Sequence, residues 1–184
     1  MAEMTATDFT NRAEEAAAQA LPYIASLLEA LGPRPPLEVL RETPQELRRM
    51  VAGLGPDELS RPEAPGKWSV RQVVQHLADS ELVGGFRFRM VLAHDRPPLA
   101  GYDQDAWADR LHYATADIGD ALEQFTALRR SNLHLLEHAT PEERQRVGLH
   151  AERGEESLSH MIRMYAGHDI VHRRQLARII AGFR

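Results

Sequence analysis

The chain of 184 residues contains no cysteine. This absence excludes a disulfide scaffold, a Cys-ligated zinc site, an iron–sulfur cluster and a cysteine nucleophile. Lysine is almost as scarce, since Lys67 is the only one and all other basic side chains that are not histidine are arginine. The net charge of -5 argues against a general nucleic-acid binder, which usually carries a basic face. Any metal must therefore be held by carboxylates or by some of the nine histidines.

Long apolar runs are also missing, so we expect no membrane-spanning segment. The start of the chain, Met1 to Thr10, lacks the basic and apolar regions of a signal peptide. With 43% hydrophobic and 27% charged residues, the composition is that of an ordinary globular protein. We therefore expect a cytoplasmic protein that acts on a small molecule and has neither a nucleic-acid nor a membrane partner.

Alternation of apolar and polar residues, which marks a half-buried strand, is nearly absent. Apolar residues at helical spacing recur instead, and capping residues and prolines mark the helix ends. Four substantial helices joined by loops predict an all-α fold, a helix bundle. We expect one helix to begin at Thr43 and the others to cover about residues 69–93, 117–138 and 157–181.

The first 36 residues predict a helical arm. Their apolar stripe contains Pro22, which predicts a kink or a late helix start. The sequence Gly32-Pro33-Arg34-Pro35-Pro36 then breaks the chain. We expect residues 1–36 to pack on the bundle or on a partner subunit, and residues 37–184 to form the bundle itself.

Two features predict special packing inside the bundle. Gly84 and Gly85 weaken the middle of the second predicted helix, so they should mark close packing or space left for something else. A connector of 23 residues, 94–116, is longer than a compact domain normally needs, and such connectors are often functional.

A histidine pair on the last predicted helix is the strongest chemical signal. His168 and His172 are four residues apart, so both imidazoles lie on one face of the helix, in line with its apolar stripe. Imidazoles that point into a bundle need polar partners, and a metal ion is one such partner. Two partly exposed histidines with hydrogen bonds at the bundle edge would have the same spacing.

A third ligand has to come from elsewhere in the chain. His76 is the best candidate, although a histidine on the flank of a helix is the common alternative, and His150 and His160 compete with it. Asp169 stands where a zinc protease helix would carry its glutamate, and no histidine follows downstream. Both features argue against a zinc protease. No histidine has a glutamate three residues before it, which excludes the ferritin-like di-iron pattern.

Four groups of residues follow one another along the chain as an ordered set of motifs. They are Lys67-Trp68-Ser69-Val70, His76-Leu77-Ala78-Asp79 with Glu81, Tyr102-Asp103 with Trp107, and His168-Asp169-x-x-His172 with Gln175 and Leu176. This set resembles the DinB-like superfamily, which includes the YfiT-type bacillithiol transferases and, more distantly, the mycothiol-dependent maleylpyruvate isomerases. The resemblance covers about residues 40–180. It implies an up-down-down-up four-helix bundle, commonly a homodimer, with one divalent metal ion on three histidines.

The resemblance implies that His76, His168 and His172 are the metal ligands. Three histidines suit Zn, Ni or Fe and leave coordination positions open. An open site of this kind supports either hydrolysis by activated water or activation of a thiol. The resemblance favours a metal-dependent S-transferase that joins a low-molecular-weight thiol, similar to bacillithiol, to an electrophile. A metal-dependent hydrolase at the same site and a non-catalytic, stress-related metal-binding bundle are the alternatives.

Two carboxylates are candidates for catalysis beside the metal. Asp79 lies one helical turn after His76, and Asp169 follows His168 directly, so either can orient a ligand or accept a proton. Exposed helix carboxylates are the alternative for both. Glu81 is expected to pair with an arginine.

Four further side chains are candidates for binding the thiol or the substrate. Arg87, with Arg89 nearby, can hold an anionic group, although a salt bridge between helices is the commoner role. Tyr102 and Trp107 are expected at the mouth of the site, where packing of the long connector is the alternative role.

Overall fold

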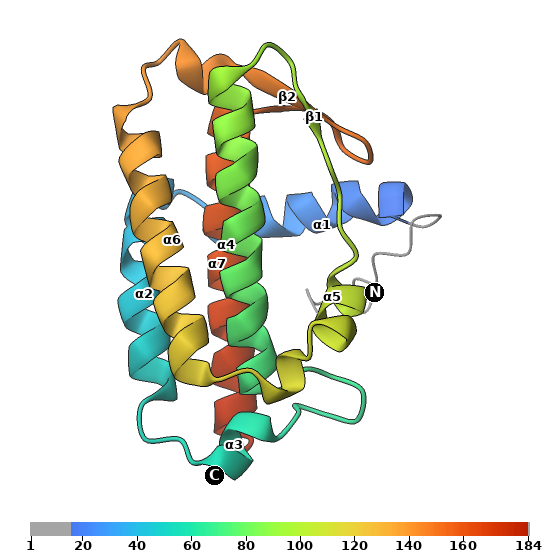
Figure 1. Cartoon of the computed structure of the whole chain (residues 1–184), viewed down its shortest axis with the longest axis vertical. Helices are drawn as coiled ribbons and strands as arrows, with labels where there is room; N and C mark the ends of the chain where they lie inside the picture. Colours follow the sequence, from blue (N-terminus) through green and yellow to red (C-terminus); the bar gives the residue numbers. More distant parts are fainter. Residues whose placement is uncertain (1–15, 184) are drawn as a thin grey trace.

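The computed structural model describes residues 16–183. Four long helices form a bundle: α2 (Pro36–Val51), α4 (Val70–Ala93), α6 (Ile118–His138) and α7 (Leu158–Ala181). In Figure 1, α4 and α6 run in one direction and α2 and α7 in the other. The predicted up-down-down-up bundle is therefore confirmed.

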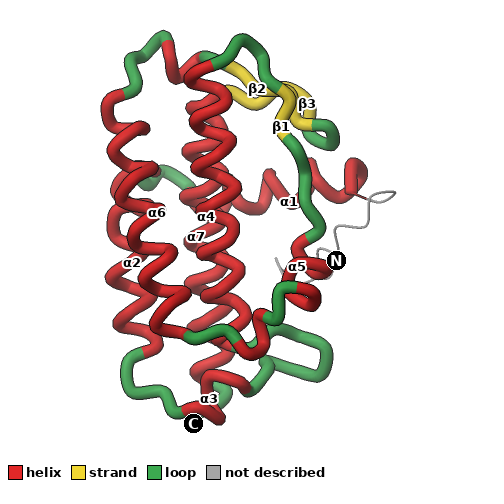
Figure 2. The backbone as a smooth tube through the Cα atoms, viewed as in Figure 1, coloured by secondary structure: helices red, strands yellow, loops and turns green. Residues whose placement is uncertain are grey.

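Short elements complete the chain (Figure 2). Strand β1 pairs in parallel with β2, and β2 pairs with β3 in the antiparallel sense. The sequence did not predict this sheet, because strands of two to four residues are too short to show alternation. The elements are α1 (Ala16–Leu31), α3 (Pro56–Ser60), β1 (Pro98–Leu99), α5 (Gln104–Arg110), η1 (Tyr113–Thr115), η2 (Glu143–Gln145), β2 (Val147–His150) and β3 (Gly154–Ser157).

Three bundle helices begin where their capping residues predict. Ser69 precedes α4 in a capping box: its hydroxyl accepts from the Gln72 amide, and the Gln72 side chain accepts from the Ser69 amide. Asp117 caps α6 and Ser157 caps α7 in the same manner, through side-chain oxygens that accept from backbone amides of the first turn.

The predicted helix start at Thr43 is wrong, because α2 begins at Pro36. Proline is favoured in the first turn, where its missing N–H costs no hydrogen bond. Thr43 lies inside the helix, and its hydroxyl donates to the Val39 carbonyl at 2.8 Å. Pro44 has no N–H for the carbonyl of Leu40, four residues earlier. That carbonyl is therefore free to accept another donor.

Helix α1 covers Ala16–Leu31 with Pro22 inside it, so of the two predicted effects of this proline the late start is wrong and the kink stays a prediction. The helix lies across the bundle beside α7 (Figure 1). Gly167 permits this contact, since a Cβ there would lie 2.1 Å from the Leu27 carbonyl oxygen. The first part of the predicted arm and the expectation for Met1 to Thr10 lie outside the described residues. The arm boundary at residue 36 stays a prediction.

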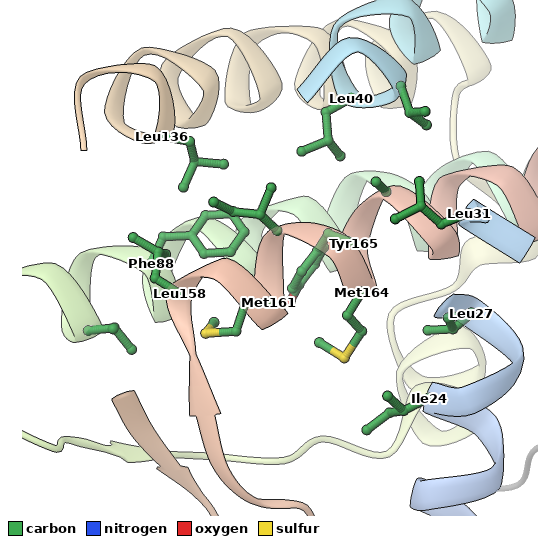
Figure 3. Packing of buried hydrophobic residues seen from close by; sticks show 14 of the residues in the cluster. Ile24, Leu27, Leu31, Leu40, Phe88, Leu136, Leu158, Met161, Met164 and Tyr165 are labelled. Atoms are coloured by element: carbon green, nitrogen blue, oxygen red, sulfur yellow. The ribbon is translucent and has the colours of Figure 1, made fainter. Parts of the chain in front are cut away.

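Two apolar clusters form the core, one toward each end of the bundle. Figure 3 shows the cluster in which α1 contributes Ile24 and Leu27 beside Met164 of α7. The prediction that Gly84 and Gly85 mark close packing is confirmed, since a Cβ on either would lie within 2.6 Å of a side chain of α7 or α6. Within residues 16–183, no helix has the length and apolarity to cross a membrane.

Candidate metal centre

Three histidines from two helices meet in the interior of the bundle. His76 comes from α4, and His168 and His172 come from adjacent turns of α7. One ring nitrogen from each lies within 4.8 Å of the others, and all three side chains are buried. The His76 and His168 Nε2 atoms are 3.1 Å apart. The structure thus brings together the three predicted ligands, while His150 and His160 lie outside the cluster.

The ring of His172 is oriented by Gln175, one turn further along α7. The His172 Nδ1–H donates to the Gln175 Oε1 at 2.8 Å, because an amide oxygen can only accept. The lone pair of this imidazole is therefore on Nε2. That atom is buried and has no hydrogen-bond partner among residues 16–183. A buried nitrogen lone pair without a hydrogen-bond donor is costly, so this atom fits the role of a metal ligand.

These imidazoles fit a divalent metal ion. Burial, together with the nearby His172, lowers the pKa of His76 well below its usual value, and burial does the same for His168. Burial lowers the pKa of His172 to about 4. All three rings are therefore neutral near pH 7, which is the form that binds metal. Two nitrogens bound tetrahedrally to one ion lie roughly 3.3 Å apart, close to the observed 3.1 Å.

Asp169 is part of a buried ion pair beside this cluster. Both of its carboxylate oxygens accept from Arg129 of α6, at 2.6 and 3.0 Å. Glu81 of α4 accepts from the same guanidinium at 2.8 Å, so the prediction that it pairs with an arginine is confirmed. Arg129 also donates to the free carbonyl of Leu40 at 2.8 Å. One arginine thereby ties all four bundle helices together, and a catalytic role for Asp169 stays a prediction.

The carboxylate of Asp79 is also engaged by neutral donors. Tyr113 donates to its Oδ2 at 2.6 Å, and Gln124 and Gln75 donate to its Oδ1 at 3.0 and 3.3 Å. These contacts hold η1 and α6 against α4. The structure places Asp79 one turn from His76, as the sequence indicates, and its catalytic role stays a prediction.

His76 and His168 line a cavity of about 90 Å³. Two predicted binding residues, Arg87 and Tyr102, line it too, whereas Trp107 does not line it and contacts Tyr102, with the ring centroids 4.6 Å apart. Burial raises the pKa of Tyr102 to about 12, so its phenol is neutral. The other lining residues are Ala20, Tyr23, Ile24, Leu27, Ser80, Gly101, Gln104, Glu152, Arg153, Met164 and Tyr165.

Arg87 is a buried cation in the wall of this cavity, only 5% exposed. Its guanidinium donates to the Tyr165 hydroxyl at 3.5 Å, to the Ala100 carbonyl, and to the His150 Nε2 at 3.4 Å. Among the described residues, no carboxylate forms an ion pair with it. Arg89 differs, because it lies at the surface and its hydrogen bonds tie α4 to α6.

Several residues of the site were not predicted. Arg129 follows Phe125 by four residues, which places it on the apolar face of α6. An arginine at such a position indicates a buried ion pair, so the sequence contained the information needed to predict it. Gln175 lies three residues after His172, which is the spacing of side chains that touch on a helix. Helix α1 gave no such signal, because its contact with the cavity depends on how distant segments pack.

Comparison with known proteins agrees with this architecture. The DinB superfamily model matches residues 39–176. YfiT of Bacillus subtilis (strain 168) is 32% identical over 146 residues, which are 77% of this chain and 82% of that protein. A protein of Oceanobacillus iheyensis is 30% identical over 129 residues, 70% of this chain and 74% of its own. Both are named as metal-dependent hydrolases, in a form that marks the activity as unproven.

A solved structure of YfiT from Bacillus subtilis has the same fold. The two structures superpose with a TM-score of 0.73 at 30% sequence identity, over 79% of this chain and 86% of that one. It is described as having an unusual four-helix bundle topology. The chain belongs to the DinB superfamily.

Proposed function

We propose that the protein is a metal-dependent S-transferase that joins an anionic low-molecular-weight thiol, such as bacillithiol, to an electrophile. The observation that carries this proposal is the cavity that His76 and His168 of the histidine cluster share with Arg87. A cation buried in a cavity wall without a carboxylate partner is suited to bind an anionic ligand. The missing cysteine is consistent with a sulfur that arrives on the second substrate.

His76, His168 and His172 would hold the ion, with Zn, Ni or Fe as the suitable metals. A divalent ion on three neutral imidazoles would supply a positive charge that stabilises a thiolate. Gln175 fixes the His172 ring so that its Nε2 lone pair faces the site. In the overall reaction the thiol loses its proton, the sulfur forms a bond to carbon, and the bond to the leaving group or the epoxide oxygen breaks.

The carboxylates near the site favour a thiol over water as the nucleophile. Asp79 and Asp169 are held by other side chains and do not line the cavity, whose lining carboxylate is Glu152. A free thiol already ionises with a pKa of about 8.5, whereas water reaches a pKa of about 7 only when a metal ion binds it, so a thiol depends less on the metal and on a protein base.

Hydrolysis is the second candidate, supported by the names of the relatives. In that reaction Glu152 is the cavity-lining group that would accept a proton from water.

The test uses zinc-loaded protein with bacillithiol and either 1-chloro-2,4-dinitrobenzene or an epoxide, with the conjugate measured by mass spectrometry. We expect Arg87→Gln to raise the KM for the thiol at least tenfold, because a charge-assisted bond is lost. Arg89→Gln, on the surface of the same helix, is the matched control and should leave this KM unchanged. Equal effects of both variants would contradict the assigned role of Arg87.

Cleavage of esters by the zinc-loaded protein without any thiol, and no conjugate with it, would favour the hydrolase. If neither reaction occurs and removal of the metal unfolds the protein, the metal is structural and both enzymatic proposals fail.

A further inference from the structure

Helix α1 forms one wall of the cavity beside the histidine cluster, although it precedes the region that matches the DinB superfamily model. Four of its residues line the cavity, the apolar Ala20, Ile24 and Leu27 together with Tyr23, and Met164 of α7 adds to the apolar lining. Figure 3 shows Ile24 and Leu27 beside Met164. The lining also contains the polar groups of Arg87, His76 and His168.

The position of this wall relative to the metal ligands is fixed by packing. Gly167, directly before His168, meets the backbone of Leu27, and any larger residue would overlap it. Ile24 and Leu27 are buried in the same core cluster as the first turns of α7. The apolar wall and the ligand helix are therefore parts of one packed unit.

We propose that α1 is the specificity element of the enzyme and that it binds the apolar part of the electrophile. This inference rests on the proposed thiol transfer, with the anionic thiol bound near Arg87 and the electrophile between the histidines and α1. The substrate class is a compact electrophile with a short hydrocarbon group, such as an alkyl epoxide. The cavity of about 90 Å³ suits such a group, because engineered cavities of about 150 Å³ hold benzene.

The reaction with an epoxide is balanced without another reactant. The thiol sulfur forms a bond to one epoxide carbon, the C–O bond of that carbon breaks, and the resulting alkoxide takes up the proton that the thiol lost. Burial of each additional CH₂ against α1 contributes about 0.8 kcal/mol, which corresponds to an increase in kcat/KM of up to about fourfold.

The experiment compares 1,2-epoxypropane with 1,2-epoxypentane on the zinc-loaded wild type, Ala20→Leu and Ala25→Leu. Ala20 lines the cavity and is 2% exposed, whereas Ala25 lies on the solvent side of the same helix. We expect the wild type and Ala25→Leu to prefer the longer epoxide, and Ala20→Leu to lose that preference at least fivefold. An unchanged preference in Ala20→Leu would overturn the proposal.

A binding measurement separates this inference from the proposed reaction. Calorimetric titration with butanoate and hexanoate should give a Kd for hexanoate up to about sixteenfold lower in the wild type and in Ala25→Leu, from two additional CH₂ groups. In Ala20→Leu the two acids should bind within threefold of each other. Equal Kd values for the two acids in the wild type would overturn the assignment of α1, even if thiol transfer occurs.

Ile24→Ala provides an independent variant if Ala20→Leu does not fold, since it enlarges the cavity instead of filling it. It should bind octanoate more tightly, relative to hexanoate, than the wild type does. The same ratio in both proteins would count against the proposed wall. If the predicted binding pattern appears while no thiol is transferred to any epoxide, the thiol-transfer proposal fails and the apolar wall stands.

Discussion

Replacement of Arg129 by methionine tests whether one buried arginine holds together the four bundle helices and the turn of α7 that carries His168. The guanidinium is 2% exposed, and its two carboxylate partners, Glu81 and Asp169, are 3% and 1% exposed. Arg129→Met would leave both carboxylates buried without a cation, and removal of one partner from a buried ion pair costs about 3–5 kcal/mol. For a domain of this size, that loss corresponds to a decrease in Tm of about 6–20 °C.

The assay is urea unfolding of metal-free protein at pH 7, followed by circular dichroism. Arg130→Met is the matched control, because Arg130 is the adjacent, exposed residue of α6 and its loss should change the free energy of unfolding by less than about 0.5 kcal/mol. Adding Glu81→Gln and Asp169→Asn to Arg129→Met should recover part of the loss, because no buried charge is left. A cost of Arg129→Met below about 1 kcal/mol would refute the reasoning.

Three further changes test other contacts. Gln175→Leu removes the acceptor of the His172 Nδ1–H and should weaken zinc binding about 10–100-fold in a chelator competition, and unchanged affinity would contradict the contact. Gly167→Ala forces a Cβ onto the Leu27 carbonyl and should cost about 1–3 kcal/mol in urea unfolding, whereas no loss would refute the close approach. Burial lowers the pKa of His150 to about 4. As the pH falls below 6.5, this histidine therefore binds a proton in the unfolded chain before it does so in the folded chain. Stability should fall between pH 6.5 and 4, and His150→Gln should remove up to about 3 kcal/mol of that fall, whereas identical pH profiles would contradict it.

The sequence predicts the bundle well because its signals are local. Ser69, Asp117 and Ser157 each cap the helix that follows, and caps act within one turn. The same rule misplaces the start of α2, because Thr43-Pro44 has the form of a helix start while tertiary contacts continue the helix through it. The Leu40 carbonyl that Pro44 leaves free is satisfied by Arg129, 89 residues away in the chain. No local pattern contains that partner.

The residues of the candidate site also fall into two groups, those that local sequence patterns predict and those that only the fold brings together. The spacing of His168 and His172 on one helix predicts them as ligands, whereas His76 is a candidate from its place on another helix and becomes the third ligand through the order of family motifs. The two carboxylates beside them illustrate the limit of such reasoning, since sequence proximity places Asp79 and Asp169 near the ligands but does not give their hydrogen-bond donors. The role of α1 depends on the packing of Leu27 on Gly167, which only the fold reveals.

Metal content tests the central claim most directly. Protein purified without added metal or chelator should contain close to one equivalent of a divalent transition metal per chain, measured by inductively coupled plasma mass spectrometry. The His168→Ala/His172→Ala double variant, purified in the same way and shown to be folded by circular dichroism, should contain less than about a tenth of that amount, since two of three ligands are lost. Equal metal content in the two proteins would contradict the assignment of His76, His168 and His172 as a metal centre.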